Sequence, residues 1–359
     1  MRLNTRRARL GAAVAVMTAA LVLPTTTPVH AAPTATLVAD GFAGPLGLAV
    51  GDDGTIYVGD AFAGQLTTID KRGGRSVAFA NGMEVAGVDA RGRGNVAFVQ
   101  SIFAGPPEGE EPPPVLDALL STLKPNGKVT DVFSTLAFEE ATNPDAVNQY
   151  GFVEASAECQ EQAIPVAGEP YTGIIESHPY AVLIVDDGWL IADAAANAVF
   201  HVGRNGRAST LAVLPPVPNF IPPEVAELFG IPACAGETYY GEPVPTDVEL
   251  GPDGAYYVTS LPGGPELPGT GTVWRIDPAT GAMTQVAGGL SFAVDLAIAD
   301  DGTMYVAQLF DGVVSQIVGG APVPYLEIPG PTAIEFGPDG TMYVATGLVG
   351  PGAVYRVTP

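Results

Sequence analysis

The chain has 359 residues, of which 47% are apolar and 15% are charged, so it can bury a sizeable core as one large or two ordinary domains. This composition excludes a disordered chain, and the 45 glycines and 34 prolines follow no G-X-Y period, which excludes a collagen-like one. The 39 acidic and 15 basic side chains give a net charge of −24, and a surface of this sign repels nucleic acid and anionic lipid.

The first 31 residues have the pattern of a secretory signal peptide. Four arginines within the first nine residues precede an apolar run at residues 10–23, and small residues lead to Ala31, after which we expect cleavage. The run is too short to span a membrane, and no later apolar stretch reaches about 18 residues. The sequence therefore predicts a secreted protein without a membrane span, whose mature chain has 11 basic against 39 acidic side chains.

A lone strand is predicted at residues 35–39 (ATLVA), with no partner beside it in the sequence. A repeated unit then begins, made of a short apolar strand, an Asp-Gly turn and a strand that contains Tyr-Val. Its clear copies are PLGLAVGDDGTIYV at 45–58, PTDVELGPDGAYYV at 245–258, AVDLAIADDGTMYV at 293–306 and PTAIEFGPDGTMYV at 331–344. Because Asp-Gly supplies the positive φ that tight turns need, each copy predicts a β-hairpin.

Each hairpin continues into further strands, and two weaker copies complete a series that starts near residues 45, 84, 179, 245, 292 and 331. Four-stranded units at a period of about 40 residues are typical of a β-propeller. The sixth unit lacks a fourth strand, so we expect residues 35–39 to complete it and remove an exposed sheet edge. The predicted fold is all-β: residues 32–359 form a single six-bladed propeller of four-stranded antiparallel blades, closed by the N-terminal strand.

Long inserts interrupt the repeats at residues 103–120, 137–177, 215–244 and 260–271. In a propeller, the loops between second and third strands and the loops between blades emerge on the same face. All four inserts are therefore expected on that face, which we call the insert-bearing face, and binding sites are commonly carried by loops on a rigid scaffold. Within the inserts, residues 114–123 and 222–229 are expected to form short helices.

The two cysteines, Cys159 and Cys234, both lie in inserts. In an exported chain we expect a disulfide bond between them that braces two long loops, and the alternative is two free thiols. A metal site needs more ligands than this pair supplies.

Carboxylates are predicted at strand ends that point to the insert-bearing face. Asp60 and Asp193 close second strands, while Asp247 and Asp295 lie at the start of first strands. Four carboxylates near one channel mouth suit Ca²⁺, which takes hard oxygen ligands, and neighbouring carboxylates raise one another's pKa, as a general base requires. In the alternative interpretation, Asp60 and Asp193 cap strand ends, and Asp247 and Asp295 bond backbone amides of a neighbouring blade.

The mature chain has two histidines, which excludes a three-histidine zinc site. His201 lies inside the strand AVFHV and is expected to be a packed or half-exposed strand residue. His178, in SHPY at a blade start, is the candidate catalytic imidazole, and Glu84 opens another blade. No G-x-S-x-G nucleophile elbow and no phosphate-binding glycine motif are present.

Five segments resemble the ScyD/ScyE family of exported bacterial proteins, one of the NHL-like and gluconolactonase-like propellers. They are HPYAV at 178–182, LIADAAANAVFHV at 190–202, STLAVLP at 209–215, VPTDVELGPDGAYYV at 244–258 and VDLAIADDGTMYV at 294–306. The resemblance implies a six-bladed propeller, and the family takes its name from an association with scytonemin-pigment biosynthesis, although its members also occur where no pigment is expected. Gluconolactonase-like relatives use Glu, Asn and Asp residues around a channel Ca²⁺, which implies a role for Asp247 and Asp295. His178 stands where those relatives have an Asn-Pro pair.

Two functions are compatible with these features. In the first, an exported non-catalytic propeller binds a small molecule, glycan or protein on its insert-bearing face, where Phe220 and Tyr239-Tyr240 lie near Glu237 and Glu242. In the second, a Ca²⁺-dependent, lactonase-like hydrolase or lyase uses the channel-mouth residues named above. A quinone-dependent dehydrogenase is disfavoured, because few basic residues are available to hold an anionic quinone.

Overall fold

The structure, a computed structural model, describes residues 32–92, 94–105, 114–348 and 350–358. The predicted signal peptide, residues 1–31, lies outside them. In the described residues, strands form six four-stranded antiparallel sheets and two two-stranded sheets. None of the helices in these residues is long and apolar enough to cross a membrane.

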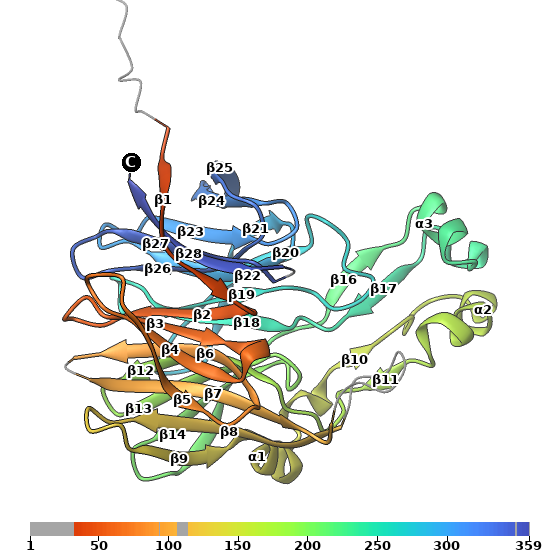
Figure 1. Ribbon diagram of the computed structural model, residues 1–359. Helices are drawn as coiled ribbons and strands as arrows, with labels where there is room; N and C mark the ends of the chain where they lie inside the picture. Colours follow the sequence, from red (N-terminus) through yellow and green to blue (C-terminus); the bar gives the residue numbers. More distant parts are fainter. Residues whose placement is uncertain (1–31, 93, 106–113, 349, 359) are drawn as a thin grey trace, which may run out of the picture. The chain divides into compact units, whose positions relative to one another are not determined.

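The six larger sheets are the blades of a propeller, which are numbered 1 to 6 in the order of the next sentence (Figure 1). From the inner strand outward they are β2(Pro45–Val50), β3(Ile56–Asp60), β4(Gln65–Ile69) and β5(Arg75–Ala80); β6(Glu84–Arg91), β7(Asn95–Phe103), β8(Val115–Leu123) and β9(Val129–Ser134); β12(Pro179–Val185), β13(Gly188–Asp193), β14(Ala198–Gly203) and β15(Ala208–Val213); β18(Pro245–Leu250), β19(Tyr256–Ser260), β20(Gly271–Ile276) and β21(Met283–Leu290); β22(Ala293–Ile298), β23(Met304–Gln308), β24(Val313–Val318) and β25(Ala321–Glu327); and β26(Pro331–Phe336), β27(Met342–Thr346), β28(Gly352–Thr358) and β1(Thr34–Phe42).

The inner strands form a closed ring. Each one contacts the inner strands of its two neighbours, in the cycle β2, β6, β12, β18, β22, β26 and back to β2. The predicted six-bladed architecture is therefore confirmed.

The ring closes through β1, which pairs antiparallel with β28, so that Thr34 lies opposite Thr358 and Phe42 opposite Gly352. Phe42 is buried in a cluster that combines blade 6 residues such as Val354 with blade 1 residues such as Leu48. The predicted closure by the N-terminal strand is confirmed, and its physical reason is that β28 would otherwise be an unpaired edge.

The repeated Asp-Gly turns connect the first and second strands of their blades. In four of them an aspartate side chain accepts a hydrogen bond from the backbone N–H two residues further on: Asp53 from Thr55, Asp253 from Ala255, Asp301 from Thr303 and Asp339 from Thr341. The following glycine has positive φ, 74° at Gly54 and 78° at Gly254, which is costly for residues with a side chain. The repeat thus encodes local turn chemistry.

Blades pack face to face through apolar clusters, such as the one in which Val99 and Leu120 of blade 2 meet Ile191 and Phe200 of blade 3. Blades 1 and 2 also contact each other through backbone atoms, with no side chain between them. A Cβ on Gly59 would lie 1.9 Å from the carbonyl oxygen of Ala86, so only glycine allows this spacing.

One helix prediction was wrong and one was confirmed. Residues 115–123 form strand β8, which pairs with β7 and β9 and shortens the predicted insert at 103–120. Pairing on both sides outweighs the helix-like spacing of the apolar residues in VLDALLSTL. Residues 223–228 form helix α3(Pro223–Leu228), within the predicted range.

The inserts between blades 2 and 3 and between blades 3 and 4 build a small subdomain, which we call the cap (residues 149–172 and 216–241). The first insert begins with α1(Thr135–Thr142) and the 3₁₀ helix η2(Pro144–Val147). The cap contains β10(Gln149–Tyr150), α2(Ala157–Ala167), β11(Tyr171–Thr172), β16(Val217–Phe220), α3, η3(Pro232–Cys234) and β17(Thr238–Gly241). Figure 1 shows α2 and α3 together, away from the blades.

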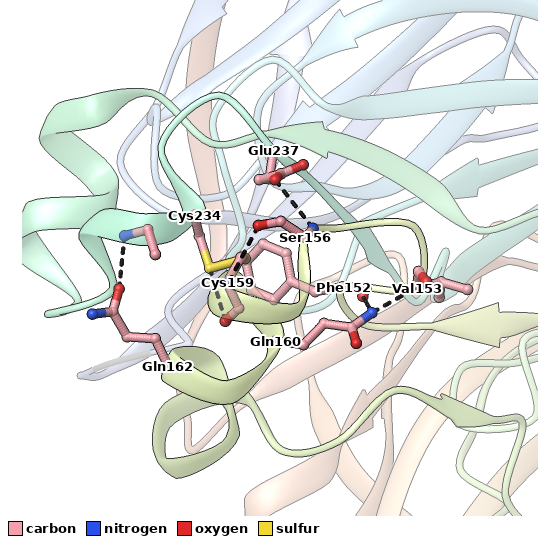
Figure 2. The surroundings of a disulfide bond; sticks show 9 residues. Phe152, Val153, Ser156, Cys159, Gln160, Gln162, Cys234 and Glu237 are labelled. Carbon is pink, nitrogen blue, oxygen red and sulfur yellow. Dashed lines mark hydrogen bonds between the residues drawn. A yellow bond between two sulfur atoms is a disulfide. The ribbon is translucent and has the colours of Figure 1, made fainter.

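The predicted disulfide bond is present between Cys159 of α2 and Cys234 of η3, which are 75 residues apart in sequence. It joins the two inserts, together with a bridge between Gly151 and Tyr240 and a core that includes Phe152 and Ile221 (Figure 2). The cap therefore has a small core of its own.

Candidate functional site

Two of the four predicted site aspartates bond the backbone just before the first strand of their own blade. Asp60, at the end of β3, accepts hydrogen bonds from the backbone N–H groups of Ala43 (2.9 Å) and Gly44 (2.8 Å). Asp193, at the end of β13, accepts them from Ser177 Oγ (2.6 Å) and from the backbone N–H of His178 (2.7 Å). Both side chains are buried, and their observed partners are those of the strand-end interpretation.

Asp247 and Asp295 face the central channel, and each bonds the next inner strand. Asp247 Oδ2 accepts from Leu296 N (2.9 Å), and Asp295 Oδ1 accepts from Ile334 N (3.0 Å). Among the described residues, no group of three or more His, Cys, Asp or Glu side chains is placed to hold a metal ion. The four aspartates are therefore not grouped around a common point.

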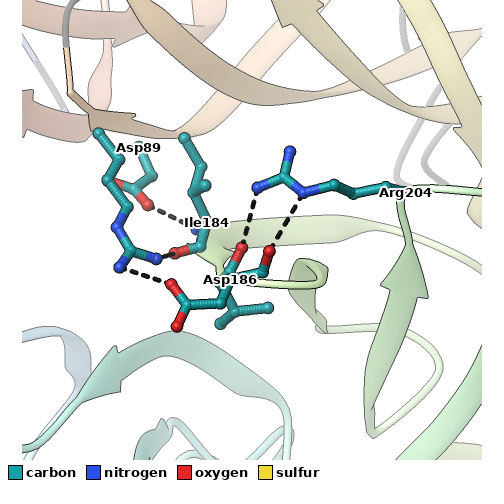
Figure 3. A network of polar contacts seen from close by, with 6 residues as sticks. Asp89, Ile184, Asp186 and Arg204 are labelled. Carbon is teal, nitrogen blue, oxygen red and sulfur yellow. Dashed lines mark hydrogen bonds and ion pairs between the residues drawn. The ribbon is translucent and has the colours of Figure 1, made fainter.

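Asp89 makes the same kind of bond between blades 2 and 3, because its Oδ2 accepts from Ile184 N at 2.6 Å (Figure 3). Close to it, Arg204 Nε donates to the backbone oxygen of Asp186 (3.2 Å), and Arg91 pairs with the Asp186 carboxylate (2.8 Å). The Asp89 and Arg91 contacts join blades 2 and 3, whereas the Arg204 bond lies within blade 3.

The channel is acidic and narrow. All six inner strands contribute to its lining, which contains five carboxylates: Asp89, Asp247, Glu249, Asp295 and Glu335. The enclosed space is about 20 Å³, which is room for a single water molecule. An organic substrate does not fit inside the channel, so the chemistry available there is limited to protons and small cations.

Burial raises the pKa of these carboxyl groups, and the charges of their neighbours add to the effect for most of them. The pKa of Asp89 is raised to about 6, that of Asp247 to about 7 and that of Glu335 to about 8. The pKa values of Glu249 and Asp295 are raised well above their usual range, first by burial and then by the other channel carboxylates. The channel therefore binds protons near neutral pH.

At the mouth of the channel, His178 Nε2 lies 2.5 Å from Glu84 Oε1. Burial alone lowers the pKa of His178, but the hydrogen bond and charge of Glu84 outweigh it and raise the pKa above its usual value. The rings of Phe103 and Tyr180 stand edge-on to the imidazole, at 5.9 and 6.5 Å between centroids. With 34% of its side chain exposed, His178 is accessible as a hydrogen-bond donor or a proton source.

His201 is placed as expected, half-exposed in β14, with Nε2 3.1 Å from Asp187 Oδ1. It takes no part in the channel mouth.

The cap contains an apolar pocket of about 210 Å³. Its lining comes from both inserts and from the loop between β19 and β20: Phe152, Val166, Ala167, Ile221, Val225, Phe229, Ile231, Tyr239, Gly264 and Pro265. Val166 is 53% exposed and Phe229 43% exposed, so the pocket is open to solvent. Because the blade 4 loop reaches the cap, the inserts at 137–177, 215–244 and 260–271 meet on one face.

Comparison with known proteins identifies the architecture and not the family. No family model matches the sequence, and no curated protein matches it. Among solved structures, a gluconolactonase from Xanthomonas campestris superposes with a TM-score of 0.57 at 12% identity, covering 92% of this chain and 95% of that one. An oxidoreductase described as a glucose dehydrogenase, from Thermus thermophilus, gives 0.57 at 14%, covering 91% and 100%. A streptogramin B lyase gives 0.51 at 15%, covering 91% and 97%. At such identities the likeness shows the propeller fold alone.

Some of these residues were predicted from the sequence and others were not. His178 and Glu84 were singled out as residues that open blades, and the structure brings them together. Glu249 and Glu335 were missed, although they occupy the same position in aligned copies, opposite Tyr257 and Tyr343. The cap pocket was also missed, although Tyr239, which lines it, was named on the insert-bearing face.

Proposed function

We propose that the protein is an exported propeller that binds a small, largely apolar ligand in the cap pocket, on its insert-bearing face. The observation that carries the proposal is the pocket itself, an open space of about 210 Å³ lined almost entirely by apolar side chains. Binding pockets are typically concave and apolar, with few polar groups. The disulfide bond and the bridge between the two inserts support it by pre-organising the lining, which lowers the entropy cost of binding.

Several parts of this proposal rest on sequence. Export rests on the pattern of residues 1–31, and membership of the ScyD/ScyE family rests on the segments quoted above. A glycan is a poorer occupant than an apolar molecule, because the pocket offers hardly any hydrogen-bonding groups to sugar hydroxyls.

A pair of substitutions on helix α3 tests the site. Val225 lines the pocket, whereas Leu228 on the same helix is 80% exposed and does not. We expect residues 32–359 to bind a neutral naphthylamine dye, Val225→Trp to weaken that binding at least about tenfold by filling the pocket, and Leu228→Trp to leave it unchanged. Fluorescence titration measures the affinities. Absence of binding by the wild type, or equal binding by Val225→Trp, would refute the proposal.

A hydrolase or lyase at the channel mouth is the second candidate, favoured by the accessible His178–Glu84 pair. Its calcium-dependent form would use Asp247 and Asp295 as ligands, but the geometry does not fit a metal at these residues, since both carboxylates bond backbone amides of neighbouring blades. A lactone-hydrolysis screen that compares the wild type with His178→Gln checks this candidate, and activity that survives the substitution would exclude it.

A further inference from the structure

Glu139 on helix α1 is a fully buried carboxyl group, with 0% of the residue exposed. Neither of its two carboxylate oxygens has a hydrogen-bond partner among the described residues. Leaving a buried polar group unpaired is costly, and an unpaired charge is more so. Glu139 takes no part in the channel, in the His178–Glu84 pair or in the lining of the cap pocket.

Two further buried oxygens in the same segment have no hydrogen-bond partner in the described part of the chain. They are Asn143 Oδ1, one helical turn after Glu139, and Asp145 Oδ1 in η2. Residues four apart on a helix are neighbours on one face. Asn143 and Asp145 both meet Gly173: Asn143 Nδ2 donates to the Gly173 carbonyl at 3.1 Å, and a Cβ on Gly173 would lie 2.0 Å from Asp145 Oδ1.

No basic side chain pairs with these carboxyl groups in the ion pairs of the described residues. Burial, followed by the charges of Asp145 and Asp193, raises the pKa of Glu139 to about 8, and burial also raises the pKa of Asp145. Asp145 is held in place through its other oxygen, which accepts from Tyr150 Oη (3.1 Å) and Asn197 Nδ2 (2.9 Å).

We propose that Glu139, Asn143 and Asp145 form a calcium site at the base of the cap. Carboxylate and amide oxygens are the hard ligands that Ca²⁺ prefers, and backbone carbonyls and water complete its six to eight ligands in proteins. The set contains no sulfur or imidazole, which zinc and copper sites favour. It uses two carboxylates and one amide, and it is distinct from the channel carboxylates.

A cation here would fasten the cap to blade 3. Asn197, which holds Asp145, also accepts a hydrogen bond from Val244 N (3.1 Å), and Asn148 near it donates to Leu214 O (2.8 Å). These contacts join η2 and the residue that follows it to both ends of the insert between blades 3 and 4. This site does not depend on what binds in the cap pocket.

Thermal unfolding of residues 32–359 in EDTA and in CaCl₂ tests the site. We expect Ca²⁺ at about 100 times its Kd to raise the Tm by about 5 °C, because a ligand that binds only the folded chain stabilises it by mass action. Glu139→Gln should abolish the rise. Glu140→Gln, on the next and exposed residue, and Asp247→Asn, in the channel, should keep it.

Terbium luminescence locates the cation independently, because Tb³⁺ replaces Ca²⁺ and is excited through nearby tyrosines. Tyr150 is the tyrosine that contacts Asp145, so Tyr150→Phe should remove most of the sensitised emission. No rise in the wild type, a rise that persists in Glu139→Gln, or emission unchanged by Tyr150→Phe would each overturn the proposal. If Glu139→Gln does not fold, the wild-type titration and Tyr150→Phe still decide.

Discussion

Asp89, Asp247 and Asp295 each extend from the inner strand of one blade to a backbone N–H of the next, at 2.6 to 3.0 Å. An inner strand is an edge strand, so N–H groups on its channel side lack a ladder partner. A carboxylate oxygen from the neighbouring blade satisfies one of them. A single residue thus stabilises the contact between two blades, but it also places carboxyl groups close together in the channel, where burial raises their pKa values.

Removing such a bond should destabilise the propeller. We expect Asp247→Ala to lower the free energy of unfolding by about 2 kcal/mol, because it leaves the buried Leu296 N–H unpaired. Asp247→Asn keeps an acceptor oxygen and should cost less. Denaturant unfolding measures both, with Asp300→Ala in an exposed turn as the control. An Asp247→Ala variant as stable as Asp300→Ala would show that the bond contributes nothing.

At the scale of single residues, the sequence predicts which aspartates of the repeats are important but not what each of them does. Asp247 and Asp295 stand out because aligned copies share them, yet a metal ligand and a hydrogen-bond acceptor need the same carboxylate. The partner that distinguishes them, the N–H of Leu296, lies 49 residues from Asp247 along the chain. Glu139 belongs to an insert without a second copy, so no comparison within the sequence could single it out.

At the scale of elements, prediction succeeded where local chemistry determines structure. The Asp-Gly hairpins form as expected because turn and strand preferences agree. Strand β8 was mistaken for a helix because its apolar spacing is ambiguous and its strand partners, β7 and β9, are known only from the fold. The cap helices and their pocket depend on contacts between two inserts. In the sequence, only the cysteine pair predicted contacts between these inserts.

The pairing of β1 with β28 leads to a prediction about truncation. Deleting residues 32–41 should lower the Tm by about 10 °C or more and cause association, because β28 becomes an exposed edge and the cluster around Phe42 opens. Deleting residues 32–33 alone, which precede the strand, should change neither. Calorimetry and size-exclusion chromatography measure the two effects, and an unchanged Tm in the longer deletion would contradict the closure.

At the scale of the whole molecule, the acidic surface and the acidic channel both make the folded state less stable as the pH rises. Native carboxyl groups with raised pKa values bind more protons than the unfolded chain does, between its ordinary values near pH 4 and the native values of about 6 to 8. The contribution of these carboxyl groups to the free energy of unfolding is therefore fully present below this window and is lost as the pH rises through it. Self-repulsion of the acidic chain adds to this trend.

We expect the Tm of residues 32–359, measured in EDTA, to be about 5 °C lower at pH 8 than at pH 5. The double variant Glu249→Gln/Glu335→Gln should flatten the profile, because it removes two channel groups whose pKa values are raised by burial. A Tm that is constant or that rises from pH 5 to pH 8 would contradict the assignment.

The closure of the ring also means that the sixth blade can form only after the other five. Five blades consist of consecutive strands, so each can form as soon as its own segment has been synthesised, whereas the sixth joins residues 324 positions apart. Until the last seven-residue strand emerges, the chain is an open arc with an unpaired strand at one end and a partly exposed core at the other. The interval in which this protein is prone to aggregate therefore ends only with its final strand.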